Sequence, residues 1–468
     1  MPRRSKRDQK VSDDSANPYS KQYNSRRGQR YYAYLISKKD GLTTSGLRND
    51  MYLVNHEKLE INSFNRNPRQ MKNYDAVEKF NHFTIERTMI EKSDDYQVHL
   101  HNHSYSQVFV DHELIGKDEK CELKSLKRIA IENEDNQLCL FVDSRPDQDY
   151  INDDFIKKSF RIKDTIGTGY SGVVNYAFSM DRKDICALKR VNKEKFSHYE
   201  GLDCTDELDM LKSLKHPNVI QLFSFYDTDK YLYLELEYAA GGNLFDRLYD
   251  NDYGKALNEF QAKCIIFQML KAVEYMHKNG VTHRDIKPEN MLLMSKEYIP
   301  LMKLSDFGTS HQKRPEKQDK KRPENQMTMS HCTVEHAAPE IIKIKMSTEE
   351  VDEEESYTSA VDLWSTGVVS YETLTARQPF EEDENVPNSI ENKILAVALN
   401  FSGDEWKYVS PYPKEFIKKV MKFEPKERLT AKEALEDEWF SNDEELVKEY
   451  SRLTSSWKKS QQIKEHNL

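Results

Sequence analysis

The spacing of apolar residues changes partway along the chain, and this change limits the folds that the chain can adopt. From about residue 30 to 145, short stretches such as "YYAYLI", "HFTIERTMI" and "YQVHLHN" alternate apolar and polar side chains. This period of two is typical of half-buried strands and favours an all-β sandwich. Further along, "NEFQAKCIIFQMLKAVEYMHKNG" repeats apolar residues at helical spacing, and its Asn258 and Gly280 are suitable boundaries for a helix.

The order of these patterns predicts a multi-domain protein. After the polar stretch "DSRPDQDYINDD", strand-like segments precede helical ones, which predicts an α+β unit with two lobes and a cleft between them. The predicted divisions are a basic disordered tail at 1–28, an all-β sandwich at 29–145, a linker at 146–155, the α+β unit at 156–442 with lobes at 156–238 and 239–442, and a C-terminal tail at 443–468.

Charge and cysteine content argue against several classes of protein. The net charge of -10 argues against general nucleic-acid binding, and six scattered cysteines without a CxxC pair indicate reduced thiols. No apolar run approaches the roughly 18 residues of a membrane span, and the N-terminus lacks the apolar core of a signal peptide. We therefore expect a soluble protein of the nucleus and/or cytoplasm, with no direct nucleic-acid or membrane contact. The basic residues at 3–7 fit either a nuclear-import signal or a solvated tail.

Three glycines in "IGTGYSGVV" lie between two strand-like stretches. Gly167, Gly169 and Gly172 lack a Cβ, so the backbone there can approach a phosphate closely. Dinucleotide-binding loops have the same spacing, but there the motif opens a helix, whereas "VVNYAFSM" continues as a strand. Lys189 follows in the apolar strand "CALKRV". Such a lysine is commonly an edge residue with its head in water, but Glu207 offers a partner that would hold it against nucleotide phosphates.

A second group of polar residues lies in "HRDIKPEN" and "SDFG". Asp285 is a candidate to accept a hydroxyl proton, and Lys287 can stabilise charge on a transferring phosphoryl group. Asn290 and Asp306 carry the hard oxygen ligands that Mg²⁺ prefers. Any one of these residues could be a polar residue with a purely structural role. Together, however, they follow one another along the chain and precede "AAPE" and "VDLWSTG". The combination predicts phosphoryl transfer from a nucleotide to a hydroxyl.

These motifs resemble those of the eukaryotic protein kinase family over roughly residues 156–442. The resemblance implies a bilobal protein kinase fold, ATP and Mg²⁺ as cofactors, and protein substrates. The implied catalytic residues are Lys189, Glu207, Asp285, Lys287, Asn290 and Thr333, with Asn290 and Asp306 as metal ligands. The implied nucleotide-binding residues are Ile166, Gly167, Thr168, Gly169, Tyr170, Ser171, Gly172, Val173, Val174, Ala187, Lys189, Leu236, Glu237, Tyr238 and Leu292.

The resemblance implies further roles within this unit. Asp362 would brace the catalytic loop, Glu340 would pair with Arg428, and the backbone of Glu237 and Tyr238 would meet the adenine. The lysine two residues after the catalytic aspartate is similar to that of serine/threonine kinases rather than tyrosine kinases. The stretches "GGNLFDRL" and "ERLTAKEALEDEWF" resemble the calcium/calmodulin-dependent and checkpoint kinase group. The implied activity is that of a serine/threonine protein kinase, with a pseudokinase scaffold as the alternative.

The strands in "VFVDHELIGKDEKCELKSLKRIAIENEDNQLCLFVD" are similar to the closing strands of a forkhead-associated domain, a phosphothreonine-binding sandwich. A sandwich before a kinase is the order of the checkpoint kinase 2 type, which implies DNA-damage or meiotic checkpoint signalling. His56 stands where that family has a phosphate-gripping arginine, and Lys79 stands where it has a serine. An imidazole lacks the two parallel hydrogen bonds of a guanidinium. We therefore expect a diverged sandwich that serves as a phosphoprotein or homodimer contact, with a phosphopeptide adaptor as the alternative.

Two further departures concern regulation and substrate choice. Met329 stands where the family has an autophosphorylated threonine, and Asn243 stands where basophilic relatives have a glutamate that reads an arginine in the substrate. Glu289 remains, so a weakened basic preference is expected. The N-terminal tail contains no Ser-Gln or Thr-Gln pair, which argues against the family's activation by upstream damage-signalling kinases.

Overall fold

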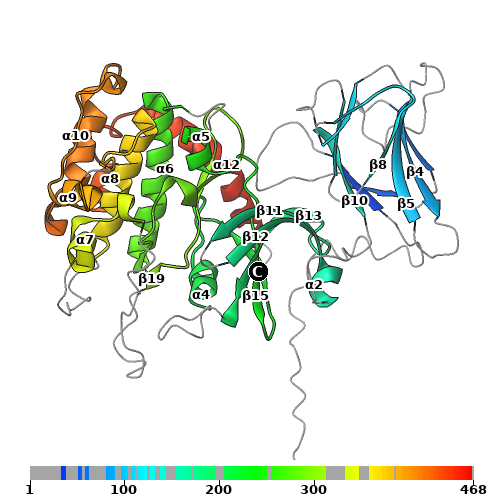
Figure 1. The fold of residues 1–468 in the computed structure, drawn as a ribbon, viewed down its shortest axis with the longest axis horizontal. Coiled ribbons are helices and arrows are strands. Elements are labelled where there is room, and N and C mark those ends of the chain that lie inside the picture. Colours follow the sequence, from blue (N-terminus) through cyan, green and yellow to red (C-terminus); the bar gives the residue numbers. More distant parts are fainter. Residues whose placement is uncertain are drawn as a thin grey trace, which may run out of the picture. The chain divides into compact units, whose positions relative to one another are not determined.

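The computed structural model describes two compact units, the first ending at Arg161 and the second beginning at Ile162 (Figure 1). We call the first the β unit and the second the two-lobed unit. The described residues are 33–37, 51–54, 58–62, 81–89, 96–103, 107–111, 113–123, 127–131, 137–143, 154–169, 172–194, 205–249, 255–312, 333–346, 358–383 and 386–465.

The β unit is built from two antiparallel sheets. The larger sheet has the strand order β2-β1-β10-β9-β6-β7, and the smaller has the order β3-β4-β5-β8. The strands are β1 (Ala33–Ser37), β2 (Met51–Val54), β3 (Lys58–Asn62), β4 (Asn81–Met89), β5 (Tyr96–Asn102), β6 (Val108–Val110), β7 (Glu113–Ile115), β8 (Lys120–Glu122), β9 (Lys127–Ile131) and β10 (Gln137–Asp143). One short helix, α2 (Asp154–Ser159), follows them and begins within the predicted linker.

Alternation of apolar residues explains why this half forms strands. On β4, Phe83 and Ile85 are fully buried, and on the adjacent β5 the same is true of Leu100, with Val98 only 1% exposed. Fully burying such a side chain contributes about 1.5–3 kcal/mol. Both sheets supply buried aliphatic residues, since Ile129 of β9 is also fully buried. The predicted β-rich first half is therefore confirmed.

The first lobe of the two-lobed unit contains a five-stranded sheet and the helix α4 (Asp206–Ser213). Leu208 and Leu211 of this helix are buried in the same apolar core as the sheet residues Leu232 and Leu234. The strand order is β11-β12-β13-β15-β14. The bounds are β11 (Phe160–Gly169), β12 (Gly172–Ser179), β13 (Asp184–Asn192), β14 (Leu222–Asp227) and β15 (Tyr231–Leu236).

The second lobe is mainly helical, and two short pairs of strands frame its polar loops. Strand β16 (Val281–Thr282) pairs with β19 (His311–Gln312), and β17 (Met291–Leu293) pairs with β18 (Met302–Leu304). These pairings bring the loop between β16 and β17 beside the loop between β18 and β19. The helices are α5 (Leu244–Tyr249), α6 (Glu259–Lys278), α7 (Pro339–Met346), α8 (Ala360–Thr375), α9 (Ser389–Leu395), α10 (Pro411–Val420), α11 (Ala431–Leu435) and α12 (Glu444–Glu465).

Helix α6 lies at the centre of this lobe, and its predicted boundaries are confirmed. The side chain of Asn258 accepts a hydrogen bond from the backbone amide of Gln261, whose own side chain accepts one from the amide of Asn258. This capping box satisfies amides at the start of the helix that otherwise lack a partner. Gly280, just beyond the end, has a φ of 70°, a conformation that favours glycine. Helix α6 contacts α8, α11 and α12.

Helix α12 occupies most of the segment that was predicted to be a C-terminal tail. Its Leu446 is only 1% exposed, and the Tyr450 hydroxyl donates a 3.0 Å hydrogen bond to Oδ1 of Asn218 in the first lobe. Leu453 is also buried, so residues that pack against the core, Leu446, Tyr450 and Leu453, recur every three or four positions on one face of the helix. The two-lobed unit therefore continues beyond residue 442.

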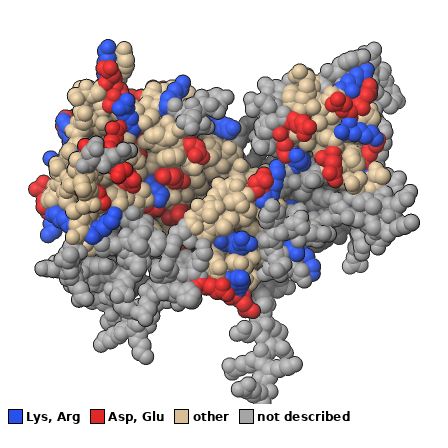
Figure 2. All heavy atoms as spheres, viewed as in Figure 1, with Lys and Arg blue, Asp and Glu red and all other residues tan. Residues whose placement is uncertain are grey.

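Charged residues of both signs are distributed over the described surface. Figure 2 shows lysine and arginine intermixed with aspartate and glutamate on one face of both units. Among the described helices, none is long and apolar enough to cross a lipid bilayer.

Candidate active site

The glycine-containing turn joins β11 to β12. Ile166, Gly167, Thr168 and Gly169 end β11, whereas Tyr170 and Ser171 lie outside the described residues. Gly172 has a φ of 153°, and a Cβ there would lie 2.3 Å from the carbonyl oxygen of Arg190 on β13. Only glycine fits this close approach between the two backbones. Gly169 has open space around it, so its predicted contact with a phosphate requires no rearrangement of neighbouring atoms.

The predicted adenine-binding residues come together where β12, β13 and β15 pair. Ala187 is opposite Leu236, and Val174 is opposite Lys189. Val174 and Leu292 pack against the apolar core to which Ala187 and Leu236 belong. Apolar side chains of both lobes thus belong to one core, which supplies apolar surface of the kind that an adenine site requires.

The segment after Leu236 contains the backbone atoms that were predicted to meet the adenine. The amide of Glu237 donates a 2.9 Å hydrogen bond to the carbonyl oxygen of Gln221. This amide is therefore engaged within the protein, and the Glu237 carbonyl oxygen is the backbone atom left to accept a hydrogen bond from a base. The next side chain, Tyr238, packs edge-on against Tyr176, with ring centroids 4.8 Å apart.

Lys189 lies in a buried cluster of charges that spans the two lobes. Its Nζ is 2.6 Å and 2.8 Å from the carboxylate oxygens of Glu207 on α4, and 3.0 Å from Oδ1 of Asp306. Burial disfavours the charged ammonium, but the charges of Asp306 and Glu207 outweigh it and raise the pKa of Lys189. The lysine is thus a fixed cation. The pairing with Glu207 was predicted, whereas the contact with Asp306 was not.

Three side chains of the second lobe contact the carboxylate of Asp285, two through hydrogen bonds and one through an ion pair. Its Oδ2 is 3.0 Å from Nζ of Lys287 and 3.0 Å from Nδ2 of Asn290, and its Oδ1 accepts a 3.3 Å hydrogen bond from the Thr333 hydroxyl. Lys287 also donates to Thr333 over 2.8 Å. Thr333 therefore connects the segment before "AAPE" to the catalytic loop, and the orientation of the carboxylate is fixed.

Asp362, at the start of α8, holds the backbone of the loop that contains Asp285. Its two carboxylate oxygens accept hydrogen bonds of 2.9 Å from the amides of His283 and Arg284, and the His277 ring bonds to it over 2.8 Å. Arg284 has a φ of 70°, an unfavourable conformation that these bonds hold in place. Burial opposes ionisation, but the bonds from the histidines outweigh it and lower the pKa of Asp362.

The two predicted metal ligands lie on adjacent segments. Ser305 donates hydrogen bonds of 2.9 Å from its amide and 3.0 Å from its hydroxyl to the Asn290 carbonyl oxygen, which places Asp306 beside Asn290. The Asn290 amide group donates to Asp285, and this leaves its side-chain oxygen for a metal. Asp306 uses Oδ1 for Lys189 and has a 40% exposed side chain. One amide oxygen and one carboxylate oxygen fit a hard divalent cation that keeps waters and nucleotide phosphates as its other ligands.

Several buried charges were not predicted. His336 bonds to Glu372 over 2.9 Å, and Tyr249 donates to the same carboxylate over 3.1 Å. The signal in the sequence was Glu372 itself, a charged residue within the apolar helix "LWSTGVVSYETLT". The predicted pair of Glu340 and Arg428 is present, with two hydrogen bonds of 2.8 Å and 2.6 Å.

Other predicted positions lie partly outside the described residues. His56, Lys79 and Met329 are outside them. Asn243 is described, and its side-chain oxygen accepts a 2.8 Å hydrogen bond from the amide of Asp246 in the first turn of α5. Asn243 thus stabilises the start of that helix.

Comparisons with known proteins agree with this geometry. A family model of the protein kinase domain matches residues 160–440. The serine/threonine-protein kinase chk-2 of Caenorhabditis elegans is 27% identical over 417 residues, which is 87% of this chain and 82% of that protein. A probable serine/threonine-protein kinase of Dictyostelium discoideum, fhkC, is 29% identical over 74% of this chain and 56% of its own length. A probable myosin light chain kinase of the same organism is 32% identical over 64% of this chain and 73% of its own length. The chain therefore belongs to the protein kinase family and is a protein serine/threonine kinase.

Proposed function

We propose that this kinase transfers the γ-phosphate of ATP to serine and threonine hydroxyls of protein substrates, with Mg²⁺ as the divalent metal. The observation that carries the proposal is the Asp285 carboxylate, which three side chains orient and which the buried Asp362 supports through the loop backbone. A carboxylate fixed in this way is suited to accept a proton from a substrate hydroxyl.

The proposed reaction is an in-line transfer in which the residues mainly position charge. The substrate hydroxyl passes its proton to Asp285 as its oxygen bonds to the γ-phosphorus, and the bond from that phosphorus to the oxygen of ADP breaks. Lys287, next to Asp285, stabilises the negative charge of the transferred group. Lys189, a fixed cation, contacts the α- and β-phosphates. Asn290 and Asp306 would hold Mg²⁺, which would supply positive charge to offset the negative charge of the phosphates.

The test replaces Asp285 with asparagine and measures γ-phosphate transfer to a mixed library of serine and threonine peptides. Loss of the proton acceptor should lower kcat roughly 100- to 10,000-fold while ATP binding is kept. The matched control is Asp209→Asn, because the Asp209 side chain is 61% exposed and belongs to helix α4 of the first lobe. Equal rates for Asp285→Asn and the unmodified protein would overturn the mechanism. ATP binding without transfer by the unmodified protein would support the pseudokinase alternative.

We further propose a weakened preference for basic substrates. The support is Asn243, which stands where basophilic relatives have glutamate, while the exposed Glu289 is retained. Asn243→Glu should raise the ratio of kcat/KM for peptides with arginine three residues before the target over peptides with alanine there. Asn243→Gln is the neutral control of equal length, and an equal rise with this variant would contradict a charge effect.

We propose that the β unit is a diverged forkhead-associated domain and that the kinase acts in checkpoint signalling in the nucleus and/or cytoplasm. Support comes from its two antiparallel sheets and from the match to chk-2 of Caenorhabditis elegans. That match covers 417 residues and therefore extends well outside residues 160–440. Its partner would be a phosphoprotein or a second copy of the chain. Titrating the full chain with phosphothreonine and unphosphorylated peptides, and measuring its mass in solution, distinguishes these partners. If the chain is a monomer and binds the two peptides equally, neither a phosphoprotein nor a second copy of the chain is its partner.

A further inference from the structure

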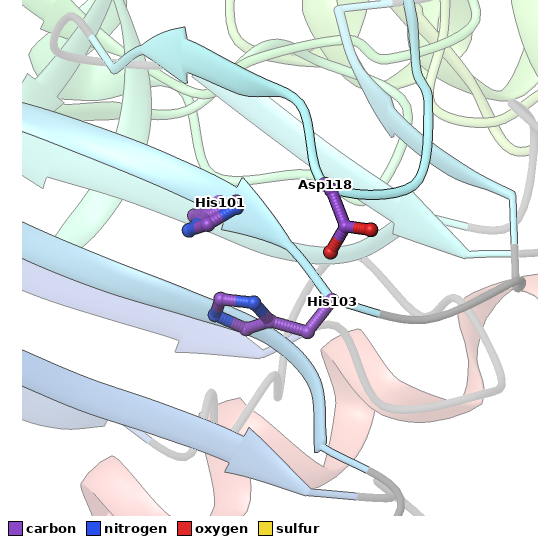
Figure 3. A group of neighbouring side chains, drawn as sticks. All are labelled: His101, His103 and Asp118. Carbon is purple, nitrogen blue, oxygen red and sulfur yellow. The ribbon is translucent and has the colours of Figure 1, made fainter.

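Two histidines and an aspartate lie together on the smaller sheet of the β unit. His101 belongs to β5, His103 follows that strand, and Asp118 lies in the turn between β7 and β8. One possible ligand atom from each residue lies within 4.8 Å of those of the other two. Figure 3 shows both rings and the carboxylate bordering one common space. Protein kinase chemistry makes no use of these residues.

The strand geometry explains why the two imidazoles are neighbours. Residues two apart on a strand project from the same face of a sheet, and the ring centroids of His101 and His103 are 4.0 Å apart. The residue between them, Asn102, points to the opposite side and is only 1% exposed. The His-x-His pair is thus presented on the outer face of the sheet by a regularly hydrogen-bonded strand.

The third residue is held against this strand by hydrogen bonds of Asn102. The amide of Asp118 donates a 2.7 Å hydrogen bond to the Asn102 carbonyl oxygen. The Asn102 side chain in turn donates a 2.9 Å hydrogen bond to the carbonyl oxygen of Ile115, at the end of β7. Both ends of the turn are therefore anchored to the residue between the two histidines. The three ligands are arranged before any metal arrives.

A hydrogen bond to Thr84 also orients the ring of His103. Nε2 of His103 is 2.9 Å from the Thr84 hydroxyl, and this hydroxyl can donate to Oε1 of Glu86 over 3.5 Å. When Thr84 donates to Glu86, its oxygen accepts the proton of Nε2, and the lone pair of His103 is then on Nδ1. Histidine ligands of metals commonly donate their other ring nitrogen in this way. The ammonium of Lys120 is paired with Glu86 over 3.4 Å, which reduces its repulsion of a cation.

The other two ligands are not engaged elsewhere in the part of the chain that the structure describes. Within it, neither the ring nitrogens of His101 nor the carboxylate of Asp118 makes a hydrogen bond or an ion pair. Their ligand atoms need only small side-chain rotations to reach the roughly 3.4 Å spacing of ligands around a tetrahedral zinc ion.

We propose that His101, His103 and Asp118 form a binding site for a divalent transition metal of the Zn²⁺ class. Imidazole and carboxylate ligands suit Zn²⁺, whereas Mg²⁺ and Ca²⁺ require mainly oxygen ligands. Three protein ligands leave a fourth position to water or to a side chain of another protein. The metal would fix the turn between β7 and β8 to the end of β5. It would therefore stabilise the β unit independently of phosphoryl transfer.

The test is a zinc titration of the full chain in competition with a chromophoric chelator. The chain has 14 histidines, and isolated surface histidines bind zinc weakly. The chelator is therefore chosen to bind zinc more tightly than such surface histidines do. The unmodified protein should bind one equivalent, and each of His101→Asn, His103→Asn and Asp118→Asn should lose at least tenfold in affinity. His99→Asn is the matched control, because His99 is on the same face of the same strand but outside the cluster, and it should keep the site.

Two further measurements separate metal binding from misfolding. The circular dichroism and melting temperature without metal should be the same for the unmodified protein, the three ligand variants and His99→Asn. Zn²⁺ should raise the melting temperature of the unmodified protein and of His99→Asn but not of the three ligand variants. Thr84→Val should weaken binding about tenfold, and Thr84→Ser, which keeps the hydroxyl, should restore it. Binding of one equivalent that survives His101→Asn or His103→Asn, or loss of the site in His99→Asn alone, would overturn the proposal.

Discussion

His336 and Glu372 form a buried acid–base pair behind the active site, where the side chains are 7% and 1% exposed. Burial alone would lower the pKa of His336, but the charge of Glu372 and its hydrogen bond outweigh this effect and raise it. A buried pair of this kind depends on both members, since removing one leaves the other without compensation. The pair connects the segment after Thr333 to helix α8.

This pair predicts a stability that depends on pH. A raised pKa in the folded state stabilises the protein fully below the unfolded pKa of about 6.5, and this contribution is lost as the pH rises through the folded pKa. Glu372→Gln removes the charge that raises the pKa. The difference in melting temperature between the unmodified protein and Glu372→Gln should therefore be larger at pH 6 than at pH 9. A difference that stays constant across this range would show that His336 is not charged in the folded state.

At the scale of single elements, the sequence predicts where a helix begins when residues that are close together in the sequence cap it. Helix α6 begins where Asn258 and Gln261 cap it, and both residues are visible in the sequence. Helix α12 also begins at a local cap, since the side chain of Asp443 accepts a 2.9 Å hydrogen bond from the amide of Leu446, but its buried face has few apolar residues among many charged ones. Packing against α6, rather than local preference, accounts for its stability.

The cap of α6 can be tested by a pair of substitutions. Asn258→Ala removes the acceptor for the amide of Gln261 and should lower the free energy of unfolding by about 1 kcal/mol. Asn258→Ser keeps an acceptor at the same position and should cost only a few tenths of a kcal/mol. Chemical denaturation followed by circular dichroism measures both. Equal losses in the two variants would mean that the capping bond contributes nothing to stability.

At the scale of the whole molecule, the two-lobed unit joins segments that are far apart in the sequence. Lys189 and Asp306 are 117 residues apart, and Tyr450 and Asn218 are 232 apart. The contact of Tyr450 links helix α12 of the second lobe to the segment that follows α4 in the first. Helix α12 is therefore part of the kinase unit, and its removal should affect more than the C-terminal end.

Leu446 and Val447 offer a matched test of this packing. Leu446 is 1% exposed, whereas its neighbour Val447 is 57% exposed. Leu446→Ala should lower the free energy of unfolding by about 2–5 kcal/mol, because it leaves a cavity between α12 and the core. Val447→Ala should change it by less than about 0.5 kcal/mol. Equal effects in thermal unfolding of the full chain would show that the helix does not pack as described.

The sequence by itself determined the β-rich and helical halves, because the periods of two and 3.6 residues depend only on the order of apolar side chains. It also placed Lys189, Asp285 and Asp306 in their motifs, since each motif has a fixed local spacing. Contacts between distant segments could not be predicted in this way. Asp306 reaches Lys189, the amide of Glu237 turns to Gln221, and Asp118 approaches His101 only because folding brings separate strands and loops together. The tertiary structure decided these contacts, since hydrogen bonds and ion pairs between distant segments leave no trace in local spacing.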